Sequence, residues 1–230
     1  MGLTFRSGDV LGLRCWPASS IGPPCRSIWH RNSAGRWTFY QDQPDQMACT
    51  RYFGADVDVV VTGPIEVTWK GERQLNVRAG GDAGVDWVIE LGSSVVSRAM
   101  SAVASALPER AWRSGPVLAM MSRVVGSVLG VGRVRLTGRT PNGHQFVVNP
   151  RPIWWVTRSS ATIASENLVP IGPLQEQAHL ADFWIPQRGL FMVGGARLRA
   201  RQPVEKGFTG QDATHVHQMT SRRLPCPEKQ

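Results

Sequence analysis

Residues 65–91 read IEVTWKGERQLNVRAGGDAGVDWVIEL, and this stretch decides the predicted fold. Apolar and polar residues alternate in three runs, at 65–70, 75–79 and 85–91, and glycine-containing turns separate these runs. Strict alternation is typical of a β-strand that buries one face. The stretch therefore predicts a three-stranded antiparallel meander. Because the edges of such strands need closure or cover, the predicted fold class is mainly β: an antiparallel barrel or strongly curved sheet.

Two amphipathic helices are expected to interrupt the strands. Apolar residues recur at helical spacing from Val95 to Leu107, where Pro108 ends the run, and again from Val117 to Leu129. Pro116 suits the first turn of the second helix, and glycines at 130 and 132 end it. The pattern predicts a two-helix hairpin inserted at residues 95–130.

Two β-hairpins are expected outside the meander. SIWHR and RWTFY flank a polar turn at 32–35, and a four-residue loop there would pair His30 with Trp37 and Ile28 with Phe39. In the second hairpin, Pro141-Asn142-Gly143 is a strong turn signal. A three-residue loop with a left-handed Gly143 would keep residues 136, 138, 146 and 148 on one face.

The rest of the chain shows weaker patterns. Strands are expected at 153–157 and 189–193, a short helical turn at 174–180, and a flexible basic tail over residues 204–230, because apolar periodicity stops after Pro203. We therefore expect a single domain over residues 1–203, with the helical insertion inside it.

Composition and missing motifs exclude several classes of protein. The chain is 42% hydrophobic and 19% charged, which is ordinary for a globular protein, and it has no apolar run near the roughly 20 residues that cross a bilayer. With no secretory signal pattern, the expected location is the cytoplasm. The four cysteines are therefore expected to be reduced thiols that bind no metal; they are Cys15, Cys25, Cys49 and Cys226. No phosphate-binding loop, GxSxG or HExxH motif occurs, so no nucleotide or other cofactor is expected.

The excess of positively charged residues has an ordinary explanation. The net charge is +9, and part of the excess lies in the predicted tail. Arg133, Arg135 and Arg139 share one strand face that could contact phosphates, yet no helix-turn-helix, RNP or zinc-finger signature accompanies them. Nucleic acid is therefore an unexpected partner, and the oligomeric state stays open.

Candidate site residues come from the predicted strands. His30, placed among aromatic side chains, would be a neutral base or simply a core histidine. Glu66, Asp86 and Glu90 lie opposite the apolar strand faces; they would be solvated, or one would act as a general acid if that face pointed inward. The chain also has nine tryptophans, which would fill a large β core or line a cavity for a hydrophobic ligand.

The WHR-x4-RW-x-FY hairpin, the tryptophan-bearing strands and the TGRTPNG hairpin together resemble lipocalin-like (calycin-type) β proteins, including the AttH and carotenoid-hydratase type. The chain is also similar to uncharacterised actinobacterial proteins, a likeness that implies no function. The lipocalin-like resemblance implies a cavity for a hydrophobic small molecule.

Two functions follow from that implied cavity. The first is non-enzymatic binding of a hydrophobic small molecule. The second is a cofactor-independent lyase, isomerase or cyclase reaction on an apolar substrate, so whether the chain is an enzyme is left open. The candidate ligand-binding residues are Trp37, Phe39, Trp69 and Trp87, and the candidate acid or base is His30.

Overall fold

The computed structural model describes residues 1–80, 84–168, 170–199 and 216–220, the last range by its backbone alone. Within these residues one 13-stranded sheet dominates the fold. Its strands are β1 (Gly2–Thr4), β2 (Val10–Trp16), β3 (Cys25–Arg31), β4 (Trp37–Gln41), β5 (Val59–Thr62), β6 (Ile65–Lys70), β7 (Gln74–Ala79), β8 (Val85–Gly92), β9 (Thr137–Arg139), β10 (Gln145–Ile163), β11 (Glu166–Asn167), β14 (Leu190–Arg199) and β15 (Val216–Thr220). A second sheet pairs β12 (His179–Leu180) with β13 (Phe183–Trp184).

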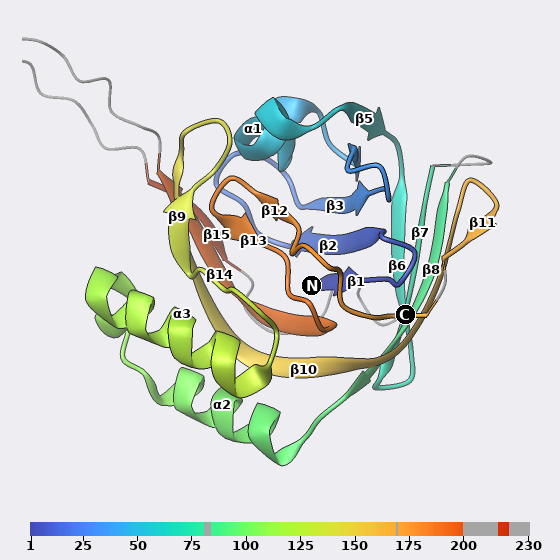
Figure 1. Cartoon of the computed structure of the whole chain (residues 1–230). Helices are drawn as coiled ribbons and strands as arrows, with labels where there is room; N and C mark the ends of the chain where they lie inside the picture. The colour runs from blue at the N-terminus through green and yellow to red at the C-terminus, as the bar shows by residue number, and fades with distance from the viewer. Residues whose placement is uncertain (81–83, 169, 200–215, 221–230) are drawn as a thin grey trace, which may run out of the picture.

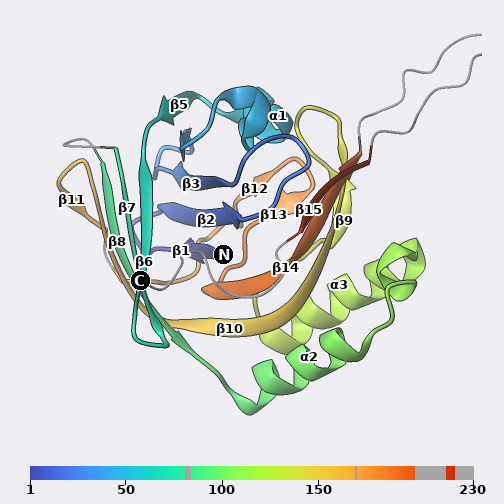
Figure 2. The ribbon, with the colours of Figure 1, turned by 180° about the vertical axis from the view of Figure 1, so that it is seen from behind.

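The main sheet curls so that its two ends meet. The strand order is β5-β4-β3-β2-β1-β14-β10-β8-β7-β6, with β9, β11 and β15 paired beside this path. β5 and β6 are the two ends of the path, yet only Gly63 and Pro64 separate them in sequence. The step from Thr62 to Ile65 covers three residues, at most about 11 Å of extended chain, so the chain itself brings the ends together. Figures 1 and 2 show the resulting half-barrel, which is compatible with a lipocalin-like fold.

The predicted antiparallel pairing holds for every pair of the path except one. β4 and β5 run parallel, with Thr38 opposite Val59. The connection between them contains η1 (Asp45–Met47), α1 (Thr50–Phe53) and η2 (Gly54–Asp56), and a long crossover of this kind is what a parallel pair requires.

The predicted meander is confirmed in β6, β7 and β8. Val67 lies opposite Val77, and Val77 lies opposite Trp87; all three are buried. On the other face, Glu66 and Asp86 are exposed. Glu90 is half-buried, and its Oε2 atom lies 4.0 Å from Nη1 of Arg158.

The two predicted helices are α2 (Val95–Ala106) and α3 (Gly115–Leu129), connected through η4 (Ala111–Arg113). The side chains of Ser94 and Ser97 form a capping box that begins α2, and α3 ends at Gly130, which has a left-handed φ of 57°. α2 lies beside β10, and α3 lies beside β9 (Figure 1). Their outward faces expose large apolar residues, namely Val95, Val96, Val103, Met120, Val124 and Val128.

Both hairpins are built on the same three-residue loop. In the second hairpin the Thr140 amide donates to the His144 carbonyl at 2.9 Å, and Gly143 has a φ of 81°, which confirms the predicted turn. Phe146 lies opposite Gly138, as expected.

The predicted register of the first hairpin is wrong by one residue. The Asn32 amide donates to the Arg36 carbonyl at 3.0 Å, and the left-handed Gly35 has a φ of 88°. The loop therefore has three residues rather than four. His30 consequently lies opposite Thr38, and Trp29 lies opposite Phe39.

Three further differences concern the ends of the chain and one loop. β1 and β2 precede the first predicted element. Residues 174–178 form no helix: they are a bend-containing loop, and the side chain of Gln187 donates to the Leu174 carbonyl and accepts from its amide. Within the predicted tail, β15 pairs with β14. The other residues after 199 lie outside the described part.

We expect Gly143→Val to lower the free energy of unfolding by about 1 kcal/mol or more, because a β-branched residue is strained at positive φ. No atom lies within 4 Å of a Cβ placed at Gly143, so backbone strain alone is tested. Urea denaturation measures the effect. Gly143→Asn is the control, since asparagine tolerates this conformation, and an unchanged midpoint for the valine variant would contradict the assignment.

Candidate functional site

A cavity of about 210 Å³ lies inside the curl. Strands β2, β3, β6, β10 and β14 contribute to its wall, together with α1, α3 and the β13 segment. The wall is rich in aromatic side chains. These are Trp16, Trp29, Tyr52, Phe53, Trp69, Phe146, Phe183, Trp184 and Phe191.

Several of these rings pack on one another and form a rigid part of the wall. The Trp29 ring stacks on Phe39 at 4.6 Å between centroids, and its centroid lies 4.7 Å from that of Phe53. Phe183 meets the Trp29, Phe53 and Phe146 rings at 5.5–5.6 Å. Offset and edge-to-face contacts of this kind stabilise aromatic clusters. The wall therefore combines a large apolar surface with a fixed shape.

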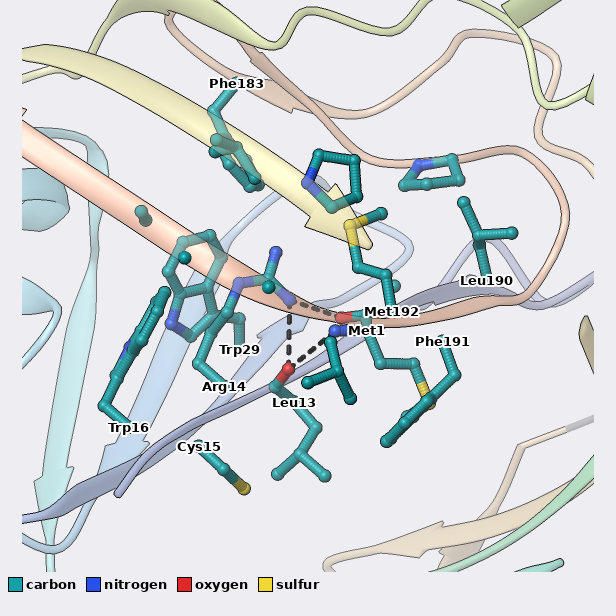
Figure 3. A pocket seen from close by; sticks show the side chains of 18 of the residues that line it. Met1, Leu13, Arg14, Cys15, Trp16, Trp29, Phe183, Leu190, Phe191 and Met192 are labelled. Atoms are coloured by element: carbon teal, nitrogen blue, oxygen red, sulfur yellow. Dashed lines mark hydrogen bonds between the residues drawn. The ribbon is translucent and has the colours of Figure 1, made fainter. Parts of the chain in front are cut away.

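Arg14 brings a positive charge to this wall. Nη1 of its guanidinium donates to the Leu13 carbonyl at 3.0 Å and also to the Met1 carbonyl. Its guanidinium carbon lies 4.5 Å from the centroid of the Trp29 ring and 5.1 Å from that of Phe183. Figure 3 shows the guanidinium beside Trp29, while Leu13 and Cys15 point to the other side of β2.

Burial lowers the pKa of Arg14 to about 10. Arg14 is therefore still protonated at neutral pH.

The described lining contains no aspartate and no glutamate. Its second arginine, Arg135, forms an ion pair with Asp182. Among the described residues Arg14 has no such carboxylate partner; its contacts are two carbonyls and two ring faces. The cavity wall is therefore mostly apolar, and Arg14 is its one arginine without an acidic partner among the described residues. The N-terminal amine of Met1 lies on the same wall and donates to the Leu13 carbonyl at 2.9 Å; burial lowers the pKa of this amine, which favours its neutral form.

Thiol and hydroxyl groups also lie at or near the wall. Burial is the main cause that raises the pKa of Cys49, whose Sγ accepts from the Ser27 hydroxyl at 3.2 Å. The Tyr52 hydroxyl is buried and has no hydrogen-bond partner in the part of the chain that the structure describes. Among the described residues, Cys25 and Cys49 form no disulfide bond. No cluster of three metal-ligating side chains occurs among the residues that the structure describes.

The predicted ligand-binding residues lie in different places. Trp69 lines the cavity. Trp37 and Phe39 belong to the buried cluster behind Trp29, and Trp87 is fully buried, where its indole nitrogen donates to Ser159 at 2.7 Å. These three residues support the wall from behind rather than form its surface.

His30 lies away from the described cavity wall. His30 and Trp29 are consecutive residues of β3 and face opposite sides, and the one-residue register shift places Phe39 opposite Trp29 instead of on the face of His30. The Nε2 atom of His30 lies 2.9 Å from Oδ1 of Asp9. Both side chains are only 12% exposed. This pair forms a local polar contact between β3 and the loop before β2.

The main residues that sequence reasoning missed are on β2. Arg14 and Trp16 follow a short apolar run, VLGL at residues 10–13, in a segment that was not recognised as a strand. A charged residue next to buried positions of such a run is the signal that would have drawn attention to Arg14.

No family model, no curated protein and no solved structure matches this chain. In the described part of the chain, no helix has the length and apolar character that crossing a membrane requires.

The buried thiol of Cys25 should make the folded state sensitive to alkaline pH. Burial raises its pKa from 9.0 to about 12. Between these values the unfolded chain has lost the proton and the folded chain retains it, so stability should fall as pH rises from 9 to 12. Urea denaturation in reducing buffer should show a steeper loss for the wild type than for Cys25→Ala. Parallel curves for the two proteins would contradict this assignment.

Proposed function

We propose that this protein binds a hydrophobic small molecule in the cavity inside its curled sheet. The observation that carries the proposal is the aromatic wall, in which nine aromatic side chains surround about 210 Å³ of space. Cavities that bind small molecules are typically concave and mostly apolar, with a few polar groups that orient the ligand. This wall has that composition.

The volume limits the size of the ligand. A cavity of about 150 Å³ in another protein holds benzene, so about 210 Å³ leaves room for one substituted ring or a chain of about eight carbons. Burial of about 200 Å² of apolar ligand surface would contribute about 5 kcal/mol before the costs of association. A contribution of about 5 kcal/mol corresponds to a Kd of about 0.2 mM at the tightest, so apolar contacts alone should give binding in the millimolar range.

The enzymatic alternative, a lyase, isomerase or cyclase acting on an apolar substrate, needs an acid or base that reaches the substrate. His30 was the candidate, and it lies outside the described cavity lining. The titratable groups on the lining are two arginines, two cysteines, one tyrosine and the N-terminal amine of Met1, which donates to the Leu13 carbonyl at 2.9 Å. The binding function therefore has the better support.

The lipocalin-like resemblance of the AttH and carotenoid-hydratase type is part of the proposal. The curled, mostly antiparallel sheet around an apolar cavity supports it. Fold analogy alone does not select a ligand, so the cavity chemistry must do so.

Filling the cavity should abolish binding. Val148 lines the cavity from β10, and Val148→Trp is expected to weaken binding of octan-1-ol, a neutral apolar probe, by at least about tenfold. Isothermal titration calorimetry measures the affinity. Val60→Trp, on the exposed edge strand β5, is the matched control and should bind like the wild type. Equal affinities for all three proteins would refute binding in this cavity.

Substitution of His30 separates the two functions. His30→Ala should leave octan-1-ol binding within about twofold of the wild type, because the side chain is outside the described lining. Native mass spectrometry of wild-type protein from its own host, followed by extraction of the bound compound, identifies the natural ligand. If the protein converts that compound and His30→Ala abolishes the conversion, the enzymatic alternative is correct.

A further inference from the structure

The charge balance of the cavity is incomplete. Its described lining holds two arginines and no acidic residue, and one of the two, Arg135, is paired with Asp182. Arg14 is left with two backbone carbonyls and two aromatic faces. Such contacts stabilise a cation without neutralising it.

The guanidinium has donors left for a further partner. It carries five N–H groups, and the two hydrogen bonds from Arg14 both start at Nη1. Its planar fork fits the two oxygens of a carboxylate. Arg14 is half-buried, and a partly desolvated charge is stabilised by an anion placed against it.

We infer that the ligand is an amphipathic anion, an apolar body of about eight carbons or one ring that carries a carboxylate paired with Arg14. The apolar body would lie against the aromatic wall, and the carboxylate would complete the charge balance at β2. A single negative charge is favoured over a phosphate dianion, because Arg14 is the one arginine of the described lining that lacks an acidic partner, and burial lowers the pKa of the nearby Met1 amine, which favours its neutral form. This inference rests on the proposed function, since it assigns the ligand of the same cavity.

The first experiment uses the wild-type protein and three probes with the same chain: octanoate, octan-1-ol and octylamine. At neutral pH their head groups are negative, neutral and positive. Isothermal titration calorimetry should show octanoate binding at least about tenfold more tightly than octan-1-ol, with octylamine weakest and one octanoate per chain. The cavity-filling variant Val148→Trp should lose octanoate binding, which separates the cavity from the many surface arginines.

The second experiment compares two substitutions of the same kind in the same cavity. Arg14→Met should remove the preference for octanoate over octan-1-ol, because the positive charge that pairs with the carboxylate is lost. Arg135→Met should keep the preference, because the positive charge of Arg135 is already paired with Asp182. Thermal unfolding of both variants checks that they are folded, and the wild-type ranking of the three probes tests the inference even if Arg14→Met fails to fold.

The outcomes distinguish this inference from the proposed function. If octanoate and octan-1-ol bind the wild type equally and Val148→Trp weakens both, the cavity binds apolar molecules but the anionic head group is wrong. If octanoate is preferred in Arg14→Met as strongly as in the wild type, the assignment to Arg14 is wrong. If none of the three probes binds the wild type, the proposed function and this inference are both wrong.

Discussion

The short connection between β5 and β6 is the constraint on which the rest of the structure depends. These two strands are opposite ends of a ten-strand hydrogen-bonded path, and only Gly63 and Pro64 join them. A flat sheet of that many strands would separate its end strands by about 40 Å, because neighbouring strands lie about 4.8 Å apart. A two-residue connection is therefore possible only if the sheet curls until its ends meet.

The curl creates an interior that two groups of residues share. One buried cluster includes Leu13 and the inward face of the β6–β8 meander, and the other gathers around Trp29 and Phe39. β2 lies between them, so successive residues of this strand face different clusters. Arg14 faces the aromatic side, where it stacks against Trp29 and Phe183. The same strand alternation that buries Leu13 thus places a guanidinium on the cavity wall.

The aromatic residues divide into those that form the cavity surface and those that hold it in place. Trp29 is at the surface, and the ring of Phe39 stacks directly against it. Trp87 is fully buried and fixed by a hydrogen bond to Ser159. Tryptophan count alone cannot separate these roles, because a ring buries a large area in either place.

The sequence by itself determined the local elements of this protein. Alternation in residues 65–91 defined the meander, and helical spacing with Pro108 and Gly130 defined the two helices. The Asn142-Gly143 turn defined the second hairpin. These elements could be predicted because backbone and turn preferences act over a few neighbouring residues. Only the tertiary structure decided the site. In the first hairpin a one-residue register shift placed Trp29 rather than His30 beside Phe39, and successive strand residues face opposite sides. Arg14 lies on the cavity wall because long-range strand pairings, such as Gly2 of β1 with Leu190 of β14, assemble that wall. The paired residues are nearly the whole domain apart in sequence, and no local pattern encodes contacts of that range.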